Sequence, residues 1–173
     1  MSRQRLMQWD QRSFTYLYLG FGQGRLASCS YWVSKTADGP LYLLLAVWLW
    51  YFGETDSRRI AQWLALAYAI ELPAYLLLKN LFRRQRPADA LAGQIRAHIR
   101  PSDQFSFPSG HTAGAFVLLT VLGSCWPWLW LPLLLWGLAV GASRLLLGVH
   151  FPGDILAGSI LGTTAALLAE SLM

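Results

Sequence analysis

The heptapeptide FSFPSGH, residues 105–111, carries the residue types that could bind and protonate an anion. Pro108 ends any preceding helix, and Ser109 can cap the helix predicted by the apolar residues after it. The N-terminus of such a helix presents free backbone N–H groups, that of Gly110 among them, and the positive end of its dipole. His111 adds a group that can hold or donate a proton near neutral pH. The stretch therefore predicts an anion-binding helix start beside a general acid.

Two further clusters of polar residues interrupt a largely apolar chain. The first is Lys79 followed by Arg86, and the second contains Arg144, His150 and Asp154. Three cations favour a strongly negative ligand, and phosphate suits the bidentate N–H pairs of arginine and the point charge of lysine. Asp154 is the one clear acidic member, whereas a metal would need several carboxylates or imidazoles on one centre. We therefore expect a phosphate site without a metal or other cofactor.

The spacing of His150 and Asp154 is suited to nucleophilic catalysis. Four residues separate them, so the carboxylate can bond one imidazole nitrogen and leave the other free to attack phosphorus. His111 could then protonate the leaving oxygen. This predicts phosphoryl transfer to His150 and hydrolysis of the phosphohistidine by water, with catalysis mainly from positioning and charge stabilisation. If another carboxylate partnered His111, the two histidines could exchange roles.

The composition indicates an integral membrane protein. The 173 residues are 55% hydrophobic and only 13% charged, and nine are Trp, a residue suited to the membrane interface. Soluble domains carry about 25% charged residues. The net charge of +5 does not indicate a nucleic-acid partner, because the basic residues gather at the N-terminus and in residues 79–100. Cys29 and Cys125 are far apart and fit neither a metal motif nor a disulfide framework.

Apolar stretches of the chain predict five membrane-spanning helices. They cover residues 41–52, 60–78, 112–124, 131–147 and 155–170. Residues 14–33 are aromatic but interrupted by glycines, which favours a segment lying in the membrane interface, although a sixth crossing or re-entrant segment would fit the distribution of arginines better. We expect an all-α, polytopic transmembrane helix bundle of five to six spans. It would form a single domain, 1–173, with an N-terminal interfacial segment, 1–39, and a catalytic helix bundle, 40–173.

Alternation of the spans brings the polar clusters to one side of the membrane. The second span ends at Lys79, the third begins at His111, the fourth ends near Arg144, and the fifth begins after His150. All four ends therefore lie at the same face. Such convergence favours an active site over the scatter expected of a structural protein.

Glu71 is a charged residue inside the second predicted span, where burial of a charge in lipid is costly. It shares a helix face with Tyr75 and Lys79, because residues four apart are neighbours on a helix. We expect this face to look inward, with Glu71 against a partner or a cavity, or protonated against a neighbouring helix.

The basic region between the second and third spans predicts a surface helix over residues 91–99, because apolar residues recur there at helical spacing. Arg83 and Arg84 are interpreted as interface anchors rather than catalytic residues. His98 is interpreted as a solvated surface residue.

The three clusters together resemble the phosphatidic acid phosphatase type 2 (PAP2) family, whose pattern is KxxxxxxRP, then PSGH, then SRxxxxxHxxxD. The chain reads KNLFRRQRP, PSGH and SRLLLGVHFPGD, without a departure in residue or spacing. The resemblance implies His150 as the nucleophile, Asp154 as its partner and His111 as the acid. It implies these phosphate ligands: Lys79, Arg86, Ser109, Gly110 and Arg144.

The resemblance further implies a metal-independent lipid phosphatase, usually with six spans, whose active site lies at the outer membrane face. The compact chain and short loops favour a bacterial inner membrane, so this site would face the periplasm. Candidate substrates are undecaprenyl diphosphate, phosphatidic acid and phosphatidylglycerol phosphate. Phosphotransfer to another lipid is an alternative, as is the vanadate-dependent oxidation of related soluble proteins, which the membrane character disfavours. A transporter or non-enzymatic scaffold would not explain the matched spacings.

Overall fold

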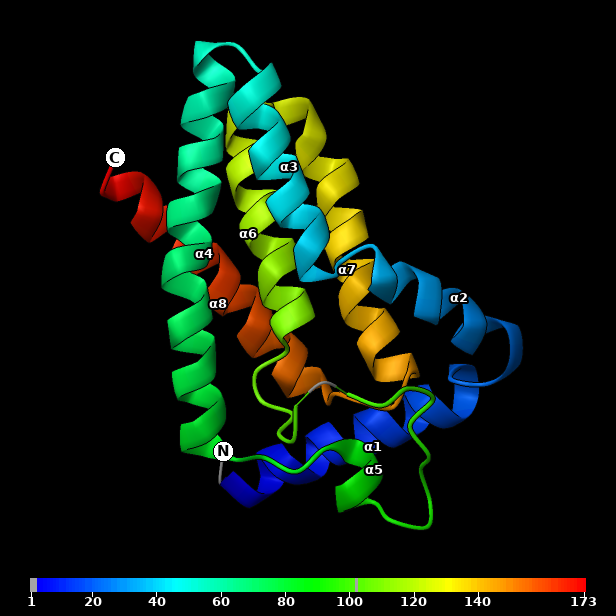
Figure 1. The fold of residues 1–173 in the computed structure, drawn as a ribbon. Helices are drawn as coiled ribbons and strands as arrows, with labels where there is room; N and C mark the ends of the chain where they lie inside the picture. The colour runs from blue at the N-terminus through cyan, green and yellow to red at the C-terminus, as the bar shows by residue number, and fades with distance from the viewer. Residues whose placement is uncertain (1–2, 102) are drawn as a thin grey trace.

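The described residues, 3–101 and 103–173, form an all-helical structure in a computed structural model (Figure 1), which confirms the predicted fold class. The elements are α1 (Arg3–Phe21), α2 (Gly24–Lys35), α3 (Gly39–Phe52), α4 (Thr55–Phe82), α5 (Pro87–Ala90), α6 (Gly110–Cys125), the 3-10 helix η1 (Pro127–Leu129), α7 (Trp130–Leu146) and α8 (Pro152–Ser171).

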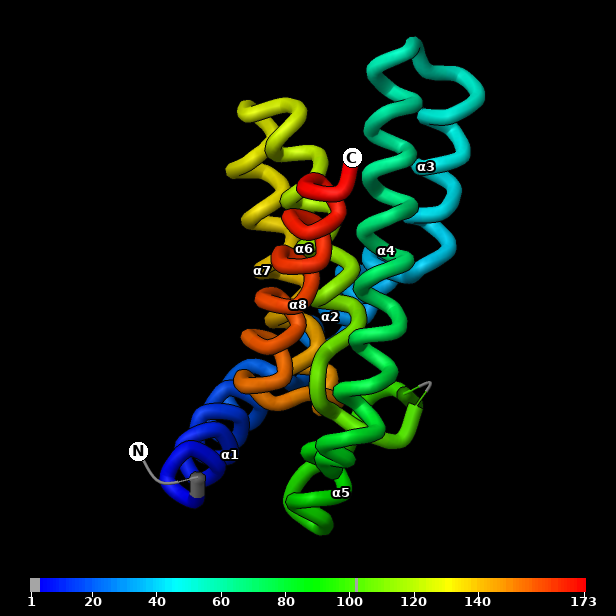
Figure 2. The backbone as a smooth tube through the Cα atoms, turned by 90° about the vertical axis from the view of Figure 1, so that its left-hand side faces the viewer, coloured from blue at the N-terminus to red at the C-terminus, as the bar shows by residue number. Residues whose placement is uncertain are grey.

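Helix α6 lies at the centre of the bundle. It packs against α4, α7 and α8, and α3 lies beside α4 on the outside (Figure 2). Most of its residues are buried, and apolar residues surround the helix rather than forming one stripe. The N-terminus of α6 is therefore held from several sides, and it is this end that carries the PSGH sequence.

Two glycines bring α8 against the first turns of α6. A Cβ atom at Gly162 would lie 2.1 Å from the carbonyl oxygen of Ala113, and one at Gly158 would lie 2.5 Å from that of Ser109. The lack of a side chain at these two positions thus permits close packing of the two helices. The contact leads directly into the polar end, where the Ser109 N–H donates to the Asp154 carbonyl at 3.0 Å.

Three stretches among the described residues are long and apolar enough to cross a membrane: 55–90, 127–146 and 152–171. Helix α6, with 16 residues, and α3, with 14, are shorter. At a rise of about 1.5 Å per residue they reach roughly 24 and 21 Å, against a hydrocarbon core of about 30 Å. The structure is a polytopic membrane bundle, and the count of five to six spans stays a prediction.

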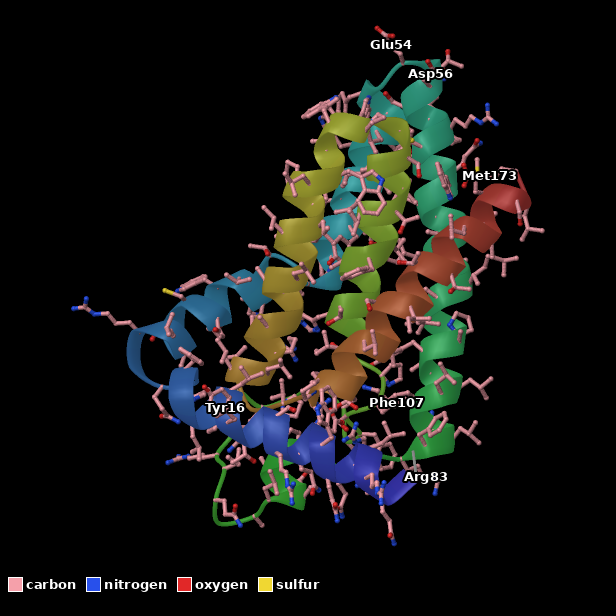
Figure 3. All side chains as sticks on the ribbon, turned by 180° about the vertical axis from the view of Figure 1, so that it is seen from behind. Tyr16, Glu54, Asp56, Arg83, Phe107 and Met173 are labelled. Carbon is pink, nitrogen blue, oxygen red and sulfur yellow. The ribbon has the colours of Figure 1, made fainter. Side chains whose placement is uncertain are left out.

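The N-terminal segment forms two helices that meet near Gly24, which has a φ of +59°. Helix α1 lies across one end of the bundle, and α2 packs along α7 (Figure 1). This end carries Arg83 and Phe107, opposite the end with Glu54 (Figure 3). The inner face of α1 buries Asp10, Phe14 and Tyr18, whereas its outer face exposes these large apolar side chains: Trp9, Tyr16 and Leu19. Such a face suits the membrane interface, and the interfacial role of residues 1–39 stays a prediction.

The prediction of a surface helix over residues 91–99 is wrong. Helix α5 ends at Ala90, and the chain continues as a turn and irregular backbone. Gly93 has a φ of +84°, which is incompatible with a right-handed helix. The His98 N–H donates instead to the Leu147 carbonyl at 3.0 Å, so contacts with the end of α7 replace helical hydrogen bonds.

Substitution of Gly162 tests the close contact of α6 and α8. Gly162→Ala should destabilise the protein by about 1–3 kcal/mol, because the added methyl overlaps a backbone oxygen that cannot move aside. The matched control is Gly20→Ala in α1, where a Cβ has no neighbour within 4 Å. Thermal unfolding in detergent should show a lower Tm for the first variant alone, and equal Tm values would contradict the packing described.

Candidate active site

The predicted site residues gather where α4 ends, α6 begins, α7 ends and the chain enters α8 (Figure 1). Arg86 marks the meeting point, because its Nη1 donates to the Val149 carbonyl at 2.8 Å and lies 3.5 Å from Nε2 of His150. Arg144 and His111 line one cavity on the same end of the bundle. The expected convergence of helix ends is therefore present in the structure.

Lys79 and Arg86 are buried cations that hold the carboxylate of Asp103 between them. Lys79 Nζ and Arg86 Nη2 lie 2.8 and 2.5 Å from Asp103 Oδ1, and the Tyr75 hydroxyl donates to Oδ2 at 2.8 Å. Burial of Asp103 opposes its ionisation, but the hydrogen bond and charge of Lys79 and the charge of Arg86 lower its pKa to about 2. The expectation that Asp154 is the one acidic member of the site is wrong, because residues outside the motifs supply further carboxylates.

Arg144 completes the set of buried cations. Its Nη1 donates to Ser34 Oγ of α2 at 2.5 Å. Among the described residues, the Arg144 Nε–H and His150 Nδ1 are buried without a hydrogen-bond partner. Buried polar atoms are normally satisfied, so an unpaired arginine donor beside a histidine indicates room for a polar ligand.

His150 and Asp154 face each other across the turn that begins α8. Nδ1 lies 3.7 Å from Asp154 Oδ2, an ion-pair distance beyond that of a hydrogen bond. Asp154 Oδ2 accepts the Phe151 N–H at 2.8 Å, which fixes the carboxylate at the helix N-terminus. Burial lowers the pKa of His150 to about 4 and outweighs the carboxylate. The imidazole is therefore neutral at pH 7, with Nε2 turned toward Arg86.

His111 also has a carboxylate partner. Its Nε2 lies 3.1 Å from Oδ1 of Asp38, in the turn between α2 and α3, and Lys35 lies 2.9 Å from the other oxygen. Partial burial raises the pKa of Asp38, but hydrogen bonds with Lys35 and His111 bring it below its usual value. The condition under which the histidines could exchange roles is thus met. Burial distinguishes them, because the side chains of His150 and Asp154 are 3% and 0% exposed and those of His111 and Asp38 are 28% and 34% exposed.

Ser109 and Gly110 build the N-terminus of α6 as the sequence predicts. The Ser109 hydroxyl accepts the Thr112 N–H at 3.4 Å and lies 2.9 Å from the Thr112 hydroxyl, which confirms the N-cap. A Cβ atom on Gly110 would lie 2.9 Å from the ring of Tyr75. The absence of a side chain there lets the helix start approach α4 and its Lys79.

The interpretation of Arg84 as an interface anchor is wrong. Its guanidinium joins two carboxylates, with Nη2 2.6 Å from Asp10 Oδ2 and Nη1 2.9 Å from Asp154 Oδ1. Arg83 is exposed and donates to the carbonyl of Asn80 in its own helix. His98 is exposed as predicted, although Nε2 lies 2.6 Å from the Gly22 carbonyl oxygen.

Two cavities of opposite character meet at His111. A largely apolar cavity of about 540 Å³ lies between α3, α4 and α6, where Tyr42, Glu71 and Leu72 are among its lining. A polar cavity of about 480 Å³ is lined by Arg144 and other polar residues. Glu71 is buried at the first cavity, as expected for a charge that avoids lipid.

Comparison with known proteins agrees with the class that the fold and site define, a helical membrane protein with a cluster of buried cations at one end. The family model of the PAP2 superfamily matches residues 60–173. The chain belongs to the PAP2 superfamily, which confirms the resemblance drawn from the three motifs.

Several relatives carry phosphatase names. "Putative undecaprenyl-diphosphatase YbjG" of Escherichia coli is 37% identical over 129 residues, 73% of this chain and 64% of that protein. Decaprenylphosphoryl-5-phosphoribose phosphatase of Mycobacterium tuberculosis is 34% identical over 163 residues, 80% and 85% of the two chains. The chain therefore spans less than two thirds of the first relative and most of the second.

The fold also matches solved protein structures. The crystal structure of Aquifex aeolicus LpxE has a TM-score of 0.80 and 26% identity, and the match covers 94% of this chain and 95% of that one. A PAP2-type phosphatidylglycerolphosphate phosphatase from Bacillus subtilis has a TM-score of 0.75 and 23% identity, covering 97% and 86%, and shows likeness of fold alone.

Removal of the Asp103 charge should strengthen the binding of phosphate-like anions. In Asp103→Asn the carboxylate no longer neutralises Lys79 and Arg86, so we expect orthovanadate to bind about tenfold more tightly, equivalent to roughly 1.4 kcal/mol. Isothermal titration calorimetry in detergent would measure this, with the exposed Asp89→Asn of α5 as the control. Unchanged or weaker binding would show that Asp103 does not compete for the anion site.

Proposed function

We propose that the protein is a metal-independent lipid phosphatase that acts through a phosphohistidine intermediate. The observation that carries the proposal is the carboxylate of Asp103 held by Lys79 and Arg86, with the neutral imidazole of His150 next to Arg86. An anion already occupies the cationic site, beside an uncharged nucleophile. A substrate phosphate would replace this carboxylate and gain bidentate contacts from arginine.

The proposed reaction has two steps at one phosphorus atom. His150 Nε2 attacks phosphorus as the bond to the leaving oxygen breaks, and His111 gives that oxygen a proton. Water then attacks phosphorus and gives a proton back to His111 as the P–N bond breaks, so the imidazole is freed and inorganic phosphate is released. Arg86, Arg144 and the N-terminus of α6 stabilise charge on the equatorial oxygens. The deeper burial of the His150–Asp154 pair supports His150 as the nucleophile over His111.

The substrate is proposed to be a membrane lipid phosphate or diphosphate. The apolar cavity at His111 supports this, because it offers space for a hydrocarbon chain directly beside the leaving-group acid. The relatives' names indicate polyprenyl diphosphates and phosphatidylglycerophosphate as first candidates. We further propose that the protein lies in a bacterial inner membrane with this end of the bundle toward the periplasm, in line with the family resemblance.

Phosphate release from a panel of lipids tests the function. With EDTA present, detergent-solubilised protein should release inorganic phosphate from at least one lipid phosphate or diphosphate, and His150→Ala should lower kcat at least about 1,000-fold. His98→Ala, at an exposed histidine, is the control and should keep wild-type turnover. No release from any lipid by folded protein would favour a transporter or scaffold, and transfer to lipid without free phosphate would favour a phosphotransferase.

The pH dependence of kcat/KM tests the neutral state that burial gives His150. Protonated His150 cannot attack, and burial places its pKa at about 4. Activity should therefore persist below the ordinary histidine pKa of about 6.5 and fall as the pH approaches about 4. The same shift predicts lower stability between these values as pH falls, because the unfolded chain binds a proton that the folded chain does not. An acid limb centred near 6.5 would contradict the assignment.

A further inference from the structure

Helix α1 is connected to the proposed nucleophile through a continuous series of ionic contacts. Asp10 Oδ2 lies 2.6 Å from Arg84 Nη2, and Arg84 Nη1 lies 2.9 Å from Asp154 Oδ1. The other oxygen of Asp154 faces Nδ1 of His150 at 3.7 Å. A residue near the N-terminus of the chain thus reaches the active site through two further side chains.

Each member of this series is held in place from more than one side. Asp10 uses its second oxygen to accept the Gly153 N–H at 2.7 Å, in the first turn of α8. The Arg84 guanidinium lies over the ring of Phe151, 4.3 Å from its centroid. The side chains of Asp10 and Asp154 are 8% and 0% exposed, and that of Arg84 is 25% exposed. Burial of two carboxylates around one arginine requires this geometry, because an unpaired buried charge is strongly destabilising.

We propose that Asp10 and Arg84 are positioning residues for phosphoryl transfer, through which α1 sets the orientation of Asp154 and so of His150. Neither side chain contacts the phosphate site, and Arg84 acts on the carboxylate oxygen that His150 does not use. The Phe151 N–H and Arg84 hold one oxygen each, which leaves the carboxylate a single orientation toward the imidazole. The inference rests on the roles of His150 and Asp154 proposed above.

Steady-state kinetics separate positioning from phosphate binding. Arg84→Gln should lower kcat about tenfold to a hundredfold, because its charge-assisted hydrogen bond to Asp154 is lost, and Asp10→Asn about fivefold, because Arg84 loses the carboxylate that holds it. KM should change less than about twofold in both variants. The double variant should be no slower than Arg84→Gln, since both act through one guanidinium. The controls Arg83→Gln and Asp89→Asn, at exposed positions, should keep wild-type values. Additive losses, or a rise in KM that accounts for the effect, would overturn the proposal.

The pH profile provides a readout that a purely structural contact would not move. Loss of the Arg84 charge makes protonation of the His150–Asp154 pair easier, so the acid limb of kcat/KM should move to higher pH in Arg84→Gln. Arg84→Lys keeps a cation at this position and should restore the limb while recovering only part of kcat. An unmoved limb in Arg84→Gln, with rates that follow only the folded fraction, would reduce the contact to a structural one and overturn the proposal.

Histidine NMR tests the link without any turnover. The chain has three histidines, so ring-labelled protein gives few signals, which His98→Ala, His111→Ala and His150→Ala would assign. The His150 signal should shift in Asp10→Asn and Arg84→Gln and stay unchanged in Arg83→Gln. If the wild-type protein released phosphate from no lipid, the proposed function would fail while this measurement still reported the contact. An unchanged His150 signal in both variants, with folding verified by Tm, would show that α1 does not reach the nucleophile.

Discussion

Compensation of buried positive charge is the constraint on which the polar end of this bundle depends. Lys79 in α4, Arg86 in the loop after α4 and Arg144 in α7 are almost fully buried. A buried cation without a polar partner would strongly destabilise the fold, so each of the three cations needs such a partner. Asp103 serves the first two, and Ser34 serves the third. These partners come from the loop before α6 and from α2, so segments outside the central bundle are required by the charges that the bundle buries.

Close contacts between the helices, made at glycines where a side chain would not fit, hold these charges in position. Gly158 and Gly162 bring α8 onto α6, and Gly110 brings α6 onto Tyr75. The Ser109 N–H then bonds the Asp154 carbonyl, which joins the turn before α6 to the turn that bears His150. The site residues are thus held in place by direct contact between the backbones of neighbouring helices. A backbone has fewer ways to relax than a long side chain, so these positions vary little.

The sequence predicted the helical architecture, the family and the convergence of the motifs, because spacing within one helix or turn is a local property. The carboxylates were missed for different reasons. Asp38 and Asp103 lie in turns that the alternation of spans places at the same face, so a signal existed for both. Asp10 had none, because the course of α1 depends on contacts with distant residues. The prediction of a helix over residues 91–99 was wrong because the apolar spacing there reflects the packing of Ile95 with α1 side chains rather than helical structure.

His111 stands between a polar and an apolar cavity, and this position bears on the fate of the two products. In the proposed reaction the scissile bond lies at this residue. The two fragments of the substrate therefore form between a cavity that suits a hydrocarbon and one that suits an anion. The hydrocarbon fragment stays in the apolar cavity, and the freed anion remains in the polar one. Recombination would require both to return against their own solubilities, so the two cavities favour separate release of the proposed products.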